Sequence, residues 1–109
     1  MSSLDKDSLD LLERLRASHP DIVFFLSNCS QVAPADMVTF LKSREVEVRL
    51  STFGHTSLIM LHEVLRSIRE NMEIRNRYLE AASWDLLSDR VADELSKRSG
   101  TPESLWSAN

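Results

Sequence analysis

Glycine is scarce in this 109-residue chain, which contains only Gly54 and Gly100. Glycine supplies the positive-φ backbone positions that tight hairpins and phosphate-cradling loops require. With so few glycines, the sequence disfavours both a β-sandwich and a nucleotide-binding α/β fold. The scarcity favours an all-α fold instead.

Cysteine and long apolar runs are also scarce. Cys29 is the only cysteine in the sequence, so no disulfide can form within it, and we expect a reducing compartment. No apolar run approaches the ~20 residues of a membrane-spanning helix. Charged residues interrupt the first twenty positions, where a signal peptide would need an apolar stretch. We therefore expect a cytoplasmic protein with no membrane partner.

The charge of the chain is modest and mixed in sign. Thirteen Lys and Arg residues stand against seventeen Asp and Glu residues, a net charge of −4 at pH 7. A nucleic-acid-binding domain commonly shows a strong basic excess, which is lacking here. Apolar residues make up 42% and charged residues 28%, close to the averages for globular domains. We expect a single helical domain over residues 1–109.

Capping residues and apolar spacing predict a small bundle of four to five helices. They cover approximately residues 4–17, 20–29, 34–44, 57–82 and 83–98. The long helix over about 57–82 contains neither Gly nor Pro and is the expected centre of the bundle. Whether 57–98 is one helix or two stays open at this point, and a final turn is expected over 101–106.

One short segment carries a conflicting pattern. Residues 45–50, Glu-Val-Glu-Val-Arg-Leu, alternate strictly between polar and apolar, which is the period of a strand. A lone strand is not stable by itself. The segment is therefore either a strand that pairs with another chain or an extension of the preceding helix.

The long helix carries a seam of apolar residues. Along it, positions 61, 65, 68, 72, 75 and 79 alternate four- and three-residue steps, and only Arg75 breaks the apolar pattern. Such a helix is either the core of one chain or an element shared between chains. The Arg-rich surroundings, and Trp106 beyond the last long helix, favour an interface. The predicted interface residues are Leu61, Leu65, Ile68, Met72, Arg75 and Leu79.

The segment from Leu26 to Phe40 resembles a helix-turn-helix motif. That motif needs a small residue where its helices cross, apolar residues around the turn, and two apolar anchors on the recognition helix. These positions are filled by Ser27, then Leu26 and Val32, then Met37 and Phe40. The chain departs from the pattern at Gln31, where the turn usually has glycine.

The resemblance implies a DNA-binding protein, similar to a small regulator or a small-terminase-like accessory protein. Thr39, Lys42 and Arg44 would then be the candidate DNA contacts. Asp36 would repel phosphate, and the recognition helix lacks the Arg, Asn or Gln that usually reads base edges. DNA binding is therefore the alternative hypothesis.

The sequence contains no motif typical of an enzyme active site or a metal site. His62-Glu63 lacks the second histidine of the zinc-protease pattern, and no activating residue accompanies Cys29 in sequence. We expect no enzyme, metal or cofactor. The first hypothesis is a non-enzymatic assembly module that binds another copy of itself or another protein through its long helix.

Overall fold

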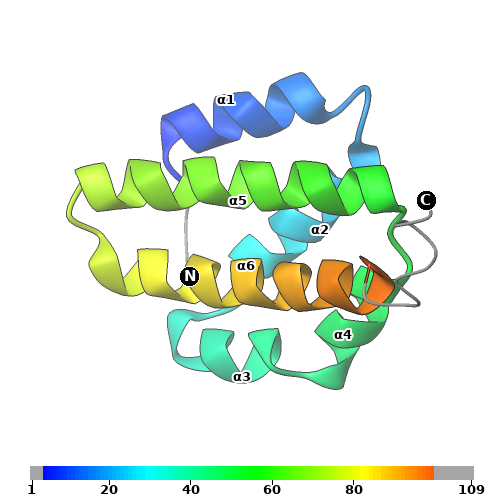
Figure 1. The fold of residues 1–109 in the computed structure, drawn as a ribbon. Coiled ribbons are helices and arrows are strands. Elements are labelled where there is room, and N and C mark those ends of the chain that lie inside the picture. Colours follow the sequence, from blue (N-terminus) through cyan, green and yellow to red (C-terminus); the bar gives the residue numbers. More distant parts are fainter. Residues whose placement is uncertain (1–3, 100–109) are drawn as a thin grey trace.

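The computed structural model describes residues 4–99 and shows an all-α fold (Figure 1). Helices make up 82% of these residues and none of them lies in a strand, so the predicted fold class is confirmed. The elements are α1 (Lys6–Leu15), α2 (Pro20–Ser30), the 3-10 turn η1 (Pro34–Asp36), α3 (Met37–Leu41), α4 (Arg44–Ser51), α5 (His55–Ile74) and α6 (Tyr78–Ser99). The turn expected over 101–106 lies outside the described residues.

An antiparallel hairpin of α5 and α6 forms the centre of the molecule (Figure 1). Helix α1 packs along α5, whereas α3 and α4 pack against α6. Helix α2 lies next to α1 and closes the bundle behind the hairpin. Every other described element therefore rests, directly or through a neighbour, on the α5–α6 pair.

The apolar seam of α5 lies inside this core. Leu61, Leu65, Ile68 and Met72 have no exposed surface, and they belong to one hydrophobic cluster with the buried face of α6. Burial of apolar surface is the main driving force of folding, and four fully buried aliphatic side chains contribute strongly to it. In the single chain, these four predicted interface residues contact their own chain and present no surface to solvent.

The predicted long helix over 57–82 is two helices. Helix α5 ends at Ile74, and α6 begins at Tyr78, ahead of the start predicted at residue 83. Asn76 takes a φ of 60°, the left-handed region that asparagine tolerates better than most residues. The chain reverses there, which answers whether 57–98 is one helix or two.

Two backbone hydrogen bonds close the end of α5. The Arg77 amide donates to the Met72 carbonyl at 2.8 Å, and the Asn76 amide donates to the Glu73 carbonyl at 3.0 Å. This pair of bonds is the Schellman arrangement, which satisfies carbonyls that a helix end leaves without partners. Here it forms around an asparagine in place of the usual glycine.

The segment with strand period, residues 45–50, is part of helix α4. The Ser43 hydroxyl caps this helix by accepting a hydrogen bond from the Val46 amide at 3.5 Å. Val46 and Leu50, four residues apart, share the buried face, whereas Val48 is exposed. The helix predicted over 34–44 is thus split, since α3 ends at Leu41 and α4 starts a separate helix.

Candidate interaction surface

Two of the six predicted interface residues are exposed, and both lie near the α5–α6 turn. Leu79, at the start of α6, is 88% exposed. Arg75 ends α5, and its guanidinium lies 3.3 Å from a carboxylate oxygen of Asp5 and 3.4 Å from one of Asp7. The turn, and not the seam of α5, therefore presents these two side chains to solvent.

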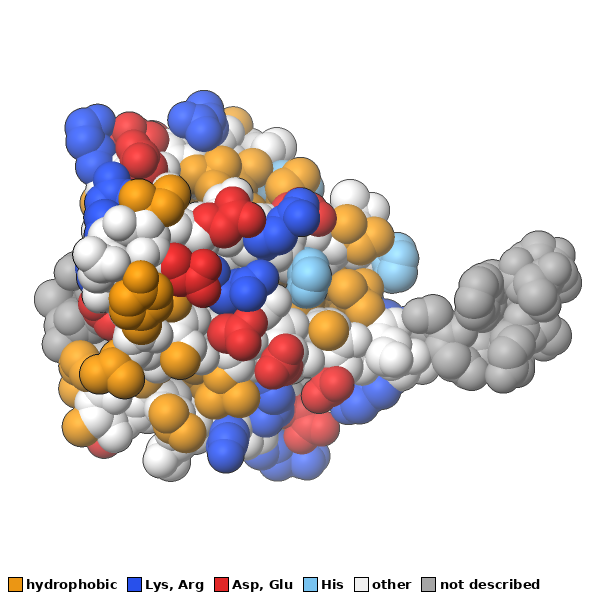
Figure 2. All heavy atoms as spheres, turned by 60° about the vertical axis from the view of Figure 1, so that its left-hand side comes forward, with side chains coloured by type: hydrophobic (Ala, Val, Ile, Leu, Met, Phe, Trp, Pro, Cys, Tyr) orange, Lys and Arg blue, Asp and Glu red, His pale blue; other side chains and the backbone are white. Residues whose placement is uncertain are grey.

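Large apolar side chains cluster at this turn. Ile74 is 76% exposed and Tyr78 is 60% exposed, on either side of the chain reversal next to Leu79. Figure 2 shows hydrophobic side chains gathered over the end of the molecule where α5 and α6 meet. Single exposed apolar residues are ordinary on a protein surface, whereas a cluster of large ones is typical of an interaction site.

An apolar groove of about 390 Å³ lies beside this cluster. One wall comes from η1 and α3, and the other comes from the first turns of α6. The apolar residues that line it are Pro34, Val38, Leu79, Ala82 and Leu86. We call these five residues, together with Ile74 and Tyr78, the turn surface.

Charged residues around the turn surface are paired within the chain. Arg77 Nε lies 2.6 Å from Glu80 Oε1, and both side chains are less than one third exposed. The hydrogen bond from Arg77 lowers the pKa of Glu80 below its ordinary value of 4.5. With Arg75 also paired to Asp5 and Asp7, the region presents no block of charge of one sign.

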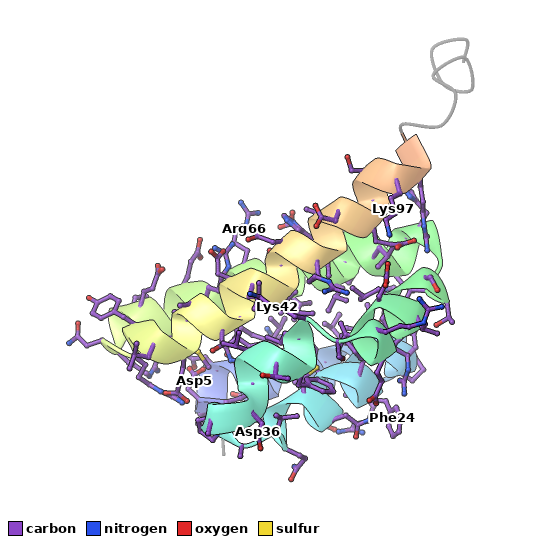
Figure 3. All side chains as sticks on the ribbon, turned by 90° about the horizontal axis from the view of Figure 1, so that it is seen from below. Asp5, Phe24, Asp36, Lys42, Arg66 and Lys97 are labelled. Atoms are coloured by element: carbon purple, nitrogen blue, oxygen red, sulfur yellow. The ribbon has the colours of Figure 1, made fainter. Side chains whose placement is uncertain are left out.

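The predicted DNA contacts belong to the segment that directly follows Val38 of the turn surface. Thr39, Lys42 and Arg44 are all exposed, at α3 and at the start of α4. Helix α3, which would read the major groove, has only five residues. Asp36 lies at the outer edge of this segment (Figure 3).

Acidic residues offset the basic ones next to Lys42. A hollow of about 540 Å³ between α4 and α6 is lined by Lys42, Glu47, Leu50, Arg90, Asp93, Glu94, Ser96 and Lys97. Within it, Lys97 Nζ lies 3.4 Å from a carboxylate oxygen of Glu47. A face of such mixed charge lacks the positive potential that attracts a phosphate backbone.

The described part of the chain contains neither a reactive thiol nor a cluster of metal ligands. Cys29 is fully buried in α2, and this burial raises the pKa of its thiol to about 12, so almost no reactive thiolate exists at neutral pH. Among residues 4–99, no group of three or more His, Cys, Asp or Glu could hold a metal ion. Nor is any helix in that range both long and apolar enough to cross a membrane.

Sequence reasoning missed most of the turn surface. Ile74 and Tyr78 were hidden inside one predicted helix, because neither glycine nor proline marks the turn between them. The available signals were Arg75, which interrupts the seam, and Asn76, which tolerates the left-handed region. Comparison with protein-family models, with curated proteins and with solved structures gives no match for this chain.

Proposed function

We propose that this protein is a non-enzymatic assembly module that associates with a second copy of itself through the turn surface. The observation that carries the proposal is the exposure of Ile74, Tyr78 and Leu79 beside an apolar groove. Burying a large apolar side chain stabilises an interface by about 1.5–3 kcal/mol. These three side chains are exposed in the isolated chain, so burying them in an interface would favour association.

The shape of the turn surface favours a second copy as its partner. In a twofold dimer the same patch meets itself, so a protruding residue on one copy must meet a hollow on the other. The turn surface holds both features, because Leu79, which is 88% exposed, lines the groove together with Val38 and Leu86. One copy can therefore insert side chains into the groove of the other.

The charges around the turn surface are compatible with this dimer. Since Arg77 pairs with Glu80, and Arg75 with Asp5 and Asp7, two copies can approach without an excess of like charge at the contact. The patch is small, and interfaces that bury less than about 1,200 Å² are typically transient. We therefore expect a reversible dimer.

Sedimentation velocity of the full chain, from low to high micromolar concentration, tests this function. The average mass should rise towards that of a dimer, and Leu79→Glu should keep the chain monomeric by placing a carboxylate in the contact. Val48→Glu is the matched control, because Val48 is an exposed aliphatic residue on α4, outside the turn surface. A monomer throughout the range, or equal loss of the dimer in both variants, would contradict the proposal.

DNA binding through Thr39, Lys42 and Arg44 is tested separately by titration with duplex DNA at low salt. Even non-specific binders hold DNA under these conditions. Given the short α3 and the acidic neighbours of Lys42, we expect no binding. Binding that Lys42→Ala and Arg44→Ala weaken for all sequences would favour the helix-turn-helix alternative.

A further inference from the structure

The hollow between α4 and α6 is polar, unlike the groove of the turn surface. Its volume of about 540 Å³ falls in the range of sites that bind small molecules. Of the residues within 4–99 that line it, only Leu50 is apolar, and six carry charged side chains. A ligand that fits this hollow must therefore be polar or charged. The hollow shares no residue with the turn surface.

Near the C-terminal end of α6, the charges of the hollow pair with one another. Lys97 Nζ lies 3.4 Å from a carboxylate oxygen of Glu47 and 3.9 Å from one of Glu94. Glu94 also pairs with Arg98, whose Nε lies 3.2 Å from its other carboxylate oxygen. This part of the hollow is therefore electrostatically satisfied without a ligand.

Two cations at the other end of the hollow have no carboxylate partner. Arg90 Nη2 donates a hydrogen bond to the Ser43 carbonyl at 3.4 Å, which holds the guanidinium beside the residue that follows Lys42. Figure 3 labels Lys42 near the middle of α6 and Lys97 towards its C-terminal end. Within residues 4–99, neither Lys42 nor Arg90 forms an ion pair. Their charges remain available to an anionic group.

Asp93 adds one unpaired charge of the opposite sign. It follows Arg90 by three residues on α6, so the two side chains share a helix face about one turn apart. Asp93 is exposed, lines the hollow and forms no ion pair in the described part of the chain. Two cations and one carboxylate without partners thus lie close together.

We propose that this hollow binds a small amino carboxylate, a molecule with one carboxylate and one ammonium group. Lys42 and Arg90 hold the carboxylate through charge-assisted hydrogen bonds, and Asp93 accepts from the ammonium. A simple carboxylate leaves Asp93 without a partner, and a simple amine meets two cations. The mixed charge that disfavours a phosphate backbone therefore favours a zwitterion.

Titration of the full chain with 4-aminobutyrate, followed by backbone amide chemical shifts, tests this inference. Amides near Ser43 and from Arg90 to Asp93 should shift together with one dissociation constant. Butyrate and butylamine have the same chain length but carry only one of the two charges. Each should bind about two- to fivefold more weakly than 4-aminobutyrate, the factor that one exposed ion pair supplies.

Two variants separate the roles of the charged groups. Lys42→Gln should weaken the binding of 4-aminobutyrate and of butyrate, whereas Asp93→Asn should weaken only that of 4-aminobutyrate. Both residues are exposed, so both variants should keep the helical circular dichroism spectrum of the parent. Arg14→Gln and Glu70→Gln remove exposed charges outside the hollow, and these matched controls should bind like the parent.

Four outcomes would overturn the inference. The first two are no shifts with 4-aminobutyrate at millimolar concentration, and shifts scattered over the surface. The third is equal affinity for butyrate, which would indicate a simple anion site, and the fourth is unchanged affinity in Lys42→Gln and Asp93→Asn. Leu79→Glu should bind 4-aminobutyrate like the parent, so a failure of the dimer proposal leaves this result readable.

Discussion

Arg75 links the start of α1 to the end of α5 through two carboxylates. The Asp5 side chain is only 6% exposed, so water screens its attraction to Arg75 less than it would at an ordinary surface carboxylate. Arg75→Gln should therefore lower the free energy of unfolding by about 1 kcal/mol, because it leaves a buried carboxylate without its cation. Urea denaturation monitored by circular dichroism measures the loss.

Arg66→Gln is the control for this prediction. Arg66 forms its ion pair with Glu63 of the same helix, and both side chains are more than half exposed. Exposed pairs of this kind contribute little to stability, because water and salt screen their attraction. If Arg66→Gln lowers the free energy of unfolding as much as Arg75→Gln does, the contact between α1 and α5 stabilises the fold no more than an exposed ion pair does.

Glu80 gives the stability of the fold a dependence on pH. Its pKa in the folded protein lies below the ordinary value of 4.5, first because of the hydrogen bond from Arg77. A carboxylate with a depressed folded pKa stabilises the fold above its unfolded pKa, and this contribution is lost as pH falls through the folded value. Glu80→Gln should thus be less stable than the parent by about 0.5–1 kcal/mol at neutral pH. The difference should shrink as pH falls from neutral through the lowered folded pKa of Glu80. A difference that stays the same from neutral to acidic pH would exclude the ion pair as its cause.

At the scale of elements, the α5–α6 turn depends on Asn76. The left-handed conformation costs about 1–2 kcal/mol for a residue with a Cβ atom, and asparagine partly avoids this cost. Asn76→Ala should lower the free energy of unfolding by about 1 kcal/mol, whereas Asn76→Gly should equal or exceed the parent because glycine has no Cβ. Thermal unfolding of the three proteins tests the order, and a glycine variant less stable than alanine would contradict it.

The elements also show what the sequence could and could not predict. Pro20 and Pro34 mark element starts correctly, since proline is pre-organised for the first helical turn. The helix ends after Leu41 and Ile74 were not predicted, because neither glycine nor proline marks them. Ser43 caps the helix that follows the first break, and Asn76 takes the left-handed conformation at the second. The sequence could not decide whether residues 45–50 form a strand or a helix, because the three apolar residues alternate with polar ones. In the folded chain Val46 and Leu50 are buried and Val48 is exposed, and only tertiary packing determines which of the three are buried.

The whole molecule determines which apolar residues are available to a partner. Spacing on α5 identified Leu61, Leu65, Ile68 and Met72 as one face, but it could not distinguish a core from an interface. That distinction depends on α6, which folds back and covers this face. The turn surface combines residues from η1, α3, α5 and α6, so no local pattern could have brought them together.

Burial of the seam predicts the result of a substitution at its centre. Ile68→Glu places a carboxylate where no surface is exposed, which costs several kcal/mol or forces the group to take up a proton. Because a domain of this size is stable by only about 5–15 kcal/mol, the variant should be largely unfolded at neutral pH. Leu79→Glu, at an exposed position, should keep its helical circular dichroism spectrum. A folded, monomeric Ile68→Glu would show instead that the seam faces another chain.

The most direct test of assembly through the turn surface is an intermolecular paramagnetic relaxation measurement. Leu79→Cys carries the nitroxide label, since the buried Cys29 is protected from labelling, and it is mixed with unlabelled, isotopically enriched chain. We predict that signals of Val38, Ala82 and Leu86 in the enriched chain broaden, while those of α4 stay sharp. A label at Val48→Cys should broaden none of the three. Equal broadening from both labels, or no broadening of the groove residues, would contradict assembly through the turn surface.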